Sequence, residues 1–127
     1  MIILDTNAVL RFLLRDDVEK AVHVRNTMDQ ETCLIPVEVV AEAIYVLAKI
    51  YGVERVLIQE KLLGVLWNEN VETPNQGVVE MALCLFGETK FDFVDCLLIG
   101  YAHIEGHQIF SFDGKLKKYL SRLTQET

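Results

Sequence analysis

The sequence has no long apolar run, which argues against a membrane-spanning helix. A span needs about 18 uninterrupted apolar residues, and every apolar run here is broken well before that length. A signal peptide is not expected either, because Asp5 interrupts the apolar start and no basic segment precedes it. We therefore expect a cytoplasmic protein that does not contact a membrane.

Cysteine is scarce and is not arranged as in a disulfide or zinc protein. The three cysteines, Cys33, Cys84 and Cys96, are odd in number and form no Cys-x-x-Cys pair. Both features disfavour a disulfide framework and a thiolate zinc site. We predict that all three are reduced and buried.

Proline and linker sequences are also rare. The chain has only two prolines and shows no repeat, no Gly/Ser-rich linker and no low-complexity tract. At 127 residues and 51% hydrophobic residues, it is long enough to bury about two thirds of its unfolded surface in one core. We expect a single domain spanning residues 1–127.

Basic residues are outnumbered by acidic ones. The chain has 12 Lys and Arg residues against 19 Asp and Glu residues, a net charge of −7. Proteins that hold nucleic acid by neutralising phosphates are ordinarily basic, so this balance argues against simple nucleic-acid binding. It leaves open a catalyst whose acids hold a metal ion.

Short apolar segments alternate with stretches of helical periodicity. Strands are predicted at 2–5, 32–36, 70–74 and 107–112. Helices are predicted at 6–15, from Asp16 or Asp17 to about 29, at 37–51, 54–68, 75–88 and 93–105, and as a short basic helix at 115–122. Helices between strands favour an α/β fold with a mainly parallel sheet, in which ligands bind at the carboxyl ends of the strands.

Two acids follow predicted strands of this sheet. Asp5 ends the first strand and Asp113 follows the last one. If those two strands lie close together in a parallel sheet, both carboxylates point into the same crevice. Taken alone, each residue is explained equally well by a site role and by a structural role, either as a helix cap or as a solvated loop acid.

Two further acids lie on predicted helices. Glu42 lies on the face of helix 37–51 opposite the apolar stripe, so its face is either solvated or functional. Glu38 lies one turn away, and like charges at that spacing repel, so the pair of glutamates does not stabilise the helix. Asp92 fits the N-cap of helix 93–105, which leaves Asp95 in the first turn, able to project towards the strand ends.

Convergence of these four acids would require compensation of their charges. Two unit charges at about 4 Å repel by roughly 4 kcal/mol at an effective dielectric constant near 20. Too few Arg and Lys residues lie nearby in the sequence to neutralise four carboxylates. Either their pKa values rise or a divalent cation binds, and oxygen ligands suit Mg²⁺ or Mn²⁺ better than Zn²⁺.

Four segments in order resemble the PIN domain family, and more narrowly its VapC-type toxin ribonucleases. They are DTN at 5–7, VAEAIYVL at 40–47, DFVDCLLIGYA at 92–102 and SFDGKL at 111–116. The resemblance covers essentially the whole chain. It implies a PIN-like three-layer α/β/α sandwich with a mainly parallel central sheet.

The resemblance also implies the members of the site. The acids that hold Mg²⁺, or Mn²⁺ in its place, would be Asp5, Glu42, Asp95 and Asp113. The polar residues that hold these acids or a water would be Asn7 and Ser111, with Thr6 close by, and Asp92 is not assigned as a ligand. On propensity alone, a structural role is as well supported as a site role: Asn7 as an ordinary helix-start residue and Ser111 as a strand-end hydroxyl.

The activity implied by the resemblance is a Mg²⁺-dependent endoribonuclease that leaves a 5′-phosphate and a 3′-hydroxyl. The implied partners are RNA, a cognate antitoxin that inserts a peptide into the site, and a second copy in a homodimer. A catalytically inactive PIN-like binding module is the alternative, although such a module would typically lack one of the four acids. A haloacid dehalogenase phosphatase is disfavoured, because Asn7 stands where that class has a second Asp, and the acids and late Lys of a receiver domain are not evident.

Other polar and apolar features carry less weight. The basic residues Arg11, Arg15, Lys115, Lys117 and Lys118 could steer RNA or form solvated faces. His103 and His107 are not expected to form a two-His metal site, because Gly106 should end the helix between them. Helix 54–68 has more apolar surface than one buried face needs. The additional surface is either part of the core or a dimer contact.

Overall fold

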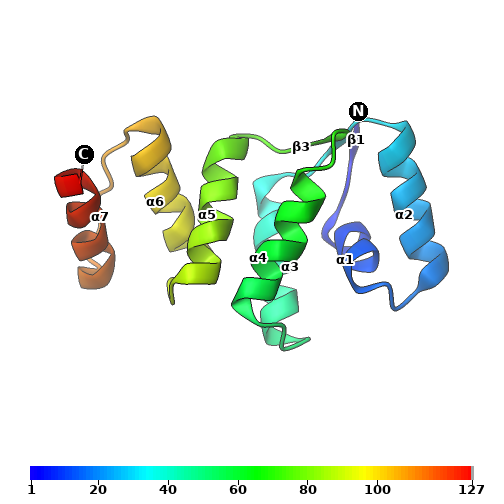
Figure 1. Ribbon diagram of the computed structural model, residues 1–127, viewed down its shortest axis with the longest axis horizontal. Coiled ribbons are helices and arrows are strands. Elements are labelled where there is room, and N and C mark those ends of the chain that lie inside the picture. Colours follow the sequence, from blue (N-terminus) through cyan, green and yellow to red (C-terminus); the bar gives the residue numbers. More distant parts are fainter. Residues whose placement is uncertain (127) are drawn as a thin grey trace.

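A computed structural model describes residues 1–126, which form seven helices and three strands. In chain order these are β1 (Ile2–Ile3), α1 (Thr6–Leu14), α2 (Val18–Gln30), β2 (Cys33–Leu34), α3 (Val37–Lys49), α4 (Arg55–Leu66), β3 (Val71–Glu72), α5 (Gln76–Glu88), α6 (Phe93–Glu105) and α7 (Gly114–Glu126). The helices follow one another along the long axis, from α2 at one end to α7 at the other (Figure 1).

The three strands form a parallel sheet in the order β1-β2-β3. The Ile2 N–H donates to the carbonyl of Thr32 at 2.9 Å and the Leu4 N–H donates to that of Leu34 at 3.0 Å. β2 is therefore the central strand, and its neighbour Ile35 is buried. The predicted α/β class with a parallel sheet is confirmed, and the arrangement is consistent with an α/β sandwich.

The prediction of a fourth strand at residues 107–112 is wrong. The segment has no strand partner among the described residues and leads from α6 into α7. Its alternating apolar pattern is that of a strand, but a strand forms only where a neighbour supplies hydrogen bonds. In Figure 1 the segment lies at the α7 end of the molecule, far from the sheet. The side chains of Phe110 and Phe112 are 87% and 89% exposed as a result.

The helices agree closely with their predicted ranges. The range 93–105 is the same in sequence and structure, and Gly106 ends α6 with a left-handed φ of 73°. Asp17 rather than Asp16 caps α2, and its carboxylate accepts the Lys20 N–H at 3.1 Å. The predicted basic helix is longer than expected, because α7 continues to residue 126.

One hydrophobic core links the sheet to the helices. On α3 the buried residues are Val40, Ala43, Ile44 and Leu47, and the opposite face with Glu42 is exposed, as predicted. On α4 the buried side runs through Ile58, Leu62, Leu63, Val65 and Leu66, whereas Val56 and Leu57 are exposed. The excess apolar surface of α4 is therefore only partly core.

The cysteines are free thiols, as predicted. Cys33 and Cys96 are fully buried, whereas Cys84 is only half-buried. Burial raises the pKa of all three thiols, and that of Cys96 reaches about 11. Within residues 1–126, no helix is both long enough and apolar enough to cross a membrane.

Two helical glycines should respond in opposite ways to replacement by alanine. A Cβ at Gly100 of α6 would lie 3.0 Å from the Val78 carbonyl oxygen of α5, so Gly100→Ala should lower the free energy of unfolding by about 1–3 kcal/mol. A Cβ at Gly64 of α4 meets nothing within 4 Å, so Gly64→Ala should raise it by about 0.5–1 kcal/mol. Urea denaturation of both variants measures the difference, and equal stabilities would contradict the close packing of α5 on α6.

Candidate metal site

Asp5 lies directly after the first strand and caps the helix that follows. Its Oδ1 accepts the Ala8 N–H at 2.8 Å, and its side chain is otherwise exposed. This hydrogen bond fixes the carboxylate at the carboxyl end of β1 while using one of its two oxygens. The cap reading and the ligand reading of Asp5 are therefore compatible.

Thr6 and Asn7 follow Asp5 in the first turn of α1. Asn7 is exposed and Thr6 is half-buried. Both lie beside the Asp5 carboxylate along the chain, as the resemblance requires. Their interaction with that carboxylate stays a prediction.

Asp92 and Asp95 open α6 in the way the sequence predicts. The Asp92 carboxylate accepts the Asp95 N–H at 2.9 Å and caps the helix, which leaves the Asp95 side chain free of that role. The pKa of Asp95 is raised, first by partial burial and then by the negative charges of Asp92 and Asp113. The fold thus brings Asp113 near Asp95 although 18 positions separate them in the sequence.

Asp113 is held in place by local hydrogen bonds before α7. The Ser111 Oγ accepts the Asp113 N–H at 3.0 Å, and the Asp113 Oδ1 accepts the Leu116 N–H at 2.9 Å. Leu116 is buried in the core, so it anchors this helix start against the rest of the molecule. Ser111 therefore contacts the backbone of the fourth acid, next to the position that the resemblance gave it.

Glu42 lies on the exposed face of α3, which packs against α1. Among residues 1–126, no three His, Cys, Asp or Glu side chains gather closely enough to hold a metal ion. Asp113 acts on the pKa of Asp95, but neither Asp5 nor Glu42 joins them in a group of three. Residues 107–112 lie outside the sheet, so the condition under which Asp5 and Asp113 would share a crevice is not met.

The donor set suits a hard divalent cation even though it is divided. All four side chains are carboxylates, which Mg²⁺ and Mn²⁺ prefer, and no His or Cys lies among them to favour Zn²⁺. The Asp95 and Asp113 pair carries mutual repulsion that a bound cation would relieve. The residues present therefore fit the metal chemically.

The basic residues of the first helix are only partly available. Arg11 pairs with Asp16 at 2.7 Å and donates to the Tyr51 hydroxyl at 3.4 Å. These contacts, led by the Tyr51 hydrogen bond, raise the pKa of Arg11. Arg15 is exposed beyond the end of α1, 5.9 Å from the Phe12 ring. Arg15 is therefore the residue of this pair that remains accessible to solvent.

Comparison with known proteins decides the family. The sequence matches the PIN domain family over residues 2–120. The chain belongs to the PIN domain family. PIN domains are generally nucleases, and they typically use divalent metals. Searches of curated proteins and of solved structures each returned no significant match.

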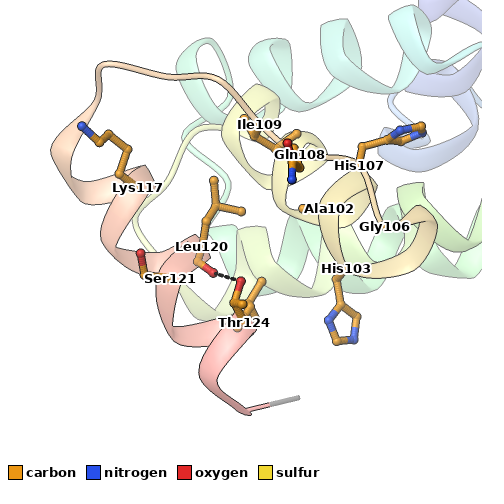
Figure 2. A pocket seen from close by; sticks show the side chains of 11 residues that line it. Ala102, His103, Gly106, His107, Gln108, Ile109, Lys117, Leu120, Ser121 and Thr124 are labelled. Carbon is orange, nitrogen blue, oxygen red and sulfur yellow. Dashed lines mark hydrogen bonds between the residues drawn. The ribbon is translucent and has the colours of Figure 1, made fainter.

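A cleft of about 650 Å³ in this PIN domain is lined by residues other than the four acids. It is lined by the end of α6, residues 106–109 and one side of α7 (Figure 2). His103, His107 and Lys117 lie around it, and none of the four acids contributes to its wall. No sequence pattern indicates this cleft, because it forms between the end of α6, the segment at 106–109 and α7, which are separate elements in the sequence.

Proposed function

We propose that this PIN domain is a Mg²⁺-dependent endoribonuclease that hydrolyses RNA phosphodiester bonds. The proposed metal ligands are Asp5, Glu42, Asp95 and Asp113, with Mn²⁺ able to replace Mg²⁺. The observation that carries the proposal is the start of α6, where partial burial and the charges of Asp92 and Asp113 raise the pKa of Asp95. Carboxylates with raised pKa values cluster at functional sites, where a bound cation relieves their repulsion.

The bound cation would neutralise a phosphate oxygen and lower the pKa of an attacking water. The chain's own contribution is to hold the acids before substrate arrives. Asp5 is fixed by the Ala8 N–H, and Asp113 by the Leu116 N–H and by Ser111. The carboxylates of Asp5 and Asp113 each use only Oδ1 in these bonds, so the second oxygen of each can still bind a cation.

Asp95 is our candidate for the general base. Partial burial and two acidic neighbours raise its pKa, which makes its carboxylate a better proton acceptor than an isolated Asp. In the proposed step it takes a proton from water as the oxygen attacks phosphorus. The bond from phosphorus to the 3′-oxygen breaks and the departing oxygen takes a proton from solvent water, leaving a 5′-phosphate and a 3′-hydroxyl.

The biological role we propose is the VapC-type toxin of a toxin–antitoxin pair. Its support is the set of four segments that resemble those toxins over most of the chain. The proposal includes a cognate antitoxin whose inserted peptide brings a basic side chain to the acids, a homodimer, and action in the cytoplasm by a single domain. The cluster of Lys115, Lys117 and Lys118 and the exposed Arg15 would contact RNA phosphates.

Cleavage of a mixed RNA substrate tests the function. Wild type should cut RNA with Mg²⁺ or Mn²⁺ and lose activity in EDTA, and Asp5→Ala should be at least about 100-fold slower. The matched control is Glu69→Ala, which removes an exposed acid after α4 and should cleave like wild type.

Two results would contradict this function. Equal cleavage by wild type and Asp5→Ala would assign the activity to a contaminant. A folded wild type that neither cleaves RNA nor binds a divalent metal would favour the inactive PIN-like binding module, which the divided acids of a single copy also suit.

A further inference from the structure

Two exposed aromatic rings lie directly before the fourth acid. Phe110 and Phe112 are 87% and 89% exposed, the highest fractions of any large hydrophobic residue in the described part of the chain. They belong to the link between α6 and α7, at the end of the molecule opposite α2 (Figure 1). Exposed apolar side chains that cluster, rather than lie scattered, mark binding surfaces.

The two rings meet edge to face. Their centroids are 5.3 Å apart and their planes are inclined at 85°. In this arrangement the ring that receives the edge keeps its outer face free, and the ring that supplies the edge keeps both faces free. Such faces are the surfaces on which unpaired nucleic-acid bases stack. The pair therefore offers flat apolar surfaces to a ligand that carries planar rings of its own.

The position of the rings next to Asp113 is fixed from both sides. Ile109, before the rings, is half-buried, and Leu116, after them, is 1% exposed. The Asp113 Oδ1 accepts the Leu116 N–H at 2.9 Å, and the Asp113 N–H donates to the Ser111 Oγ at 3.0 Å. The segment is thus anchored at its ends while its two rings stay in solvent.

The stretch of chain around the rings is basic in an otherwise acidic protein. Residues 107–124 contain Lys115, Lys117, Lys118 and Arg122 against one acid, Asp113, a net charge of +3. The rest of the chain has 8 basic and 18 acidic residues, a net charge of −10, so the whole carries −7. The three lysines are exposed. This stretch is therefore the part of the molecule that attracts a polyanion.

We propose that Phe110 and Phe112 form a stacking platform for the unpaired bases of single-stranded RNA, whose phosphates bind Lys115, Lys117 and Lys118. Aromatic rings beside basic side chains are the means by which proteins hold a single strand without reading its sequence. A duplex hides its base faces and cannot use the rings. Because Phe112 directly precedes Asp113, a strand on the platform passes beside the acids. That the polyanion is RNA rests on the proposed nuclease function.

An anionic membrane surface is the rival partner for basic and apolar side chains. A helix that lies in a membrane surface needs a free apolar face. The apolar side of α7, with Tyr119, Leu120 and Leu123, packs against the core instead. Only the two rings remain to insert, and they adjoin an acid that an anionic surface repels. The observations therefore favour RNA over lipid.

Fluorescence anisotropy of a labelled RNA in EDTA measures binding without cleavage. Wild type should bind the single strand at least about tenfold more tightly than the same strand in a duplex. Phe110→Leu/Phe112→Leu keeps apolar side chains but no ring and should lose at least about tenfold in affinity. Phe110→Tyr/Phe112→Tyr keeps both rings and should bind within about threefold of wild type. The control Trp67→Ala removes another exposed aromatic side chain and should bind like wild type.

The salt dependence of binding separates the rings from the lysines. For single strands, the logarithm of the affinity falls with the logarithm of salt concentration with a slope of about −0.7 per phosphate contact. Replacing Lys115, Lys117 and Lys118 by Gln should therefore flatten the slope by about 2. Phe110→Leu/Phe112→Leu should keep the wild-type slope, because stacking releases no counterions. A flatter slope in this variant would mean that the rings only position the lysines, and would overturn the platform.

Three other results would overturn the platform. The first is wild-type affinity for the single strand in Phe110→Leu/Phe112→Leu, and the second is equal binding of single strand and duplex by wild type. The third is binding of wild type to vesicles of phosphatidylserine and phosphatidylcholine but not to RNA, which would assign the rings to a lipid surface.

The platform and the nuclease function fail separately. A wild type that binds single-stranded RNA through the rings but does not cleave it with Mg²⁺ would refute the nuclease and keep the platform. A wild type that cleaves RNA, with unchanged affinity in Phe110→Leu/Phe112→Leu, would keep the nuclease and refute the platform.

Discussion

Asp95→Asn is expected to abolish RNA cleavage while making the metal-free protein more stable. Partial burial and the charges of Asp92 and Asp113 raise the pKa of Asp95, so the fold disfavours its ionised form. Asn has nearly the same shape, carries no charge and keeps the backbone N–H that Asp92 caps. Cleavage should fall at least about 100-fold, because the variant loses both a ligand and the proposed base.

The stability gain should depend on pH in a defined direction. The folded pKa lies above the ordinary value of 3.8, so the folded protein holds this proton more tightly than the unfolded chain does. Ionisation therefore lowers the stability of wild type as pH rises through the raised pKa, and protonation removes the penalty as pH falls below about 3.8. The Asn variant should be more stable than wild type at pH 7 and lose that advantage at acid pH.

Thermal unfolding in EDTA at pH 7 and pH 3.5 measures this difference. Asp29→Asn, at an exposed position of α2, is the matched control and should leave stability nearly unchanged at both values. A lower stability of Asp95→Asn at pH 7 would mean that Asp95 serves the fold through an attractive contact. The strained acid pair would then be wrong, and with it the observation that carries the proposed function.

Among alanine substitutions of Arg and Lys residues, Arg55→Ala is expected to lower the stability most, because Arg55 is half-buried. The Arg55 Nε donates to the Phe86 carbonyl at 2.8 Å, and its Nη2 donates to the carbonyl of Phe91. The guanidinium also lies 3.7 Å from the centre of the Phe86 ring. Removal leaves two carbonyls without a charged donor and loses the stacking contact, so unfolding free energy should fall by about 2–4 kcal/mol.

The same substitution should reach the acids. Phe91 directly precedes Asp92, so releasing its carbonyl loosens the N-cap of α6 and the position of Asp95. Urea denaturation measures the stability of Arg55→Ala, of Arg55→Lys and of the exposed control Arg25→Ala. The Lys variant keeps the charge but not the planar set of guanidinium donors, so it separates the two contributions. Lys should be intermediate and Arg25→Ala within about 0.5 kcal/mol of wild type. Full retention of stability by Arg55→Lys would show that charge alone matters.

The helices were predictable because their signals are local. Asp92 and Gly106 bound α6 at the predicted residues, since a cap and a left-handed glycine act within one turn. The exposed face of α3 that carries Glu42 was predictable from apolar spacing in the same way. The end of the first strand before Asp5 was predictable because a charged residue follows an apolar run, although of Ile2, Ile3 and Leu4 only Leu4 is buried.

The features that sequence did not predict depend on partners distant in the chain. Residues 107–112 have a strand pattern, but pairing is settled by what lies beside them, and the structure places β1 elsewhere. Val56 and Leu57 have the apolar character of core residues, yet the packing of α4 against α5 turns them outwards. Convergence of the acids is a tertiary property of the same kind, so motif order could suggest it but could not establish it.

Binding of Mn²⁺ to the native protein, measured by isothermal titration calorimetry, tests the central claim that the four acids form one metal site. Wild type and the control Glu69→Gln should bind Mn²⁺, and both Asp5→Asn and Asp113→Asn should lose at least about tenfold in affinity. These two residues lie far apart in the sequence, so a shared loss would show that they serve one ion. Wild-type affinity in either folded variant would show that they do not form one metal site.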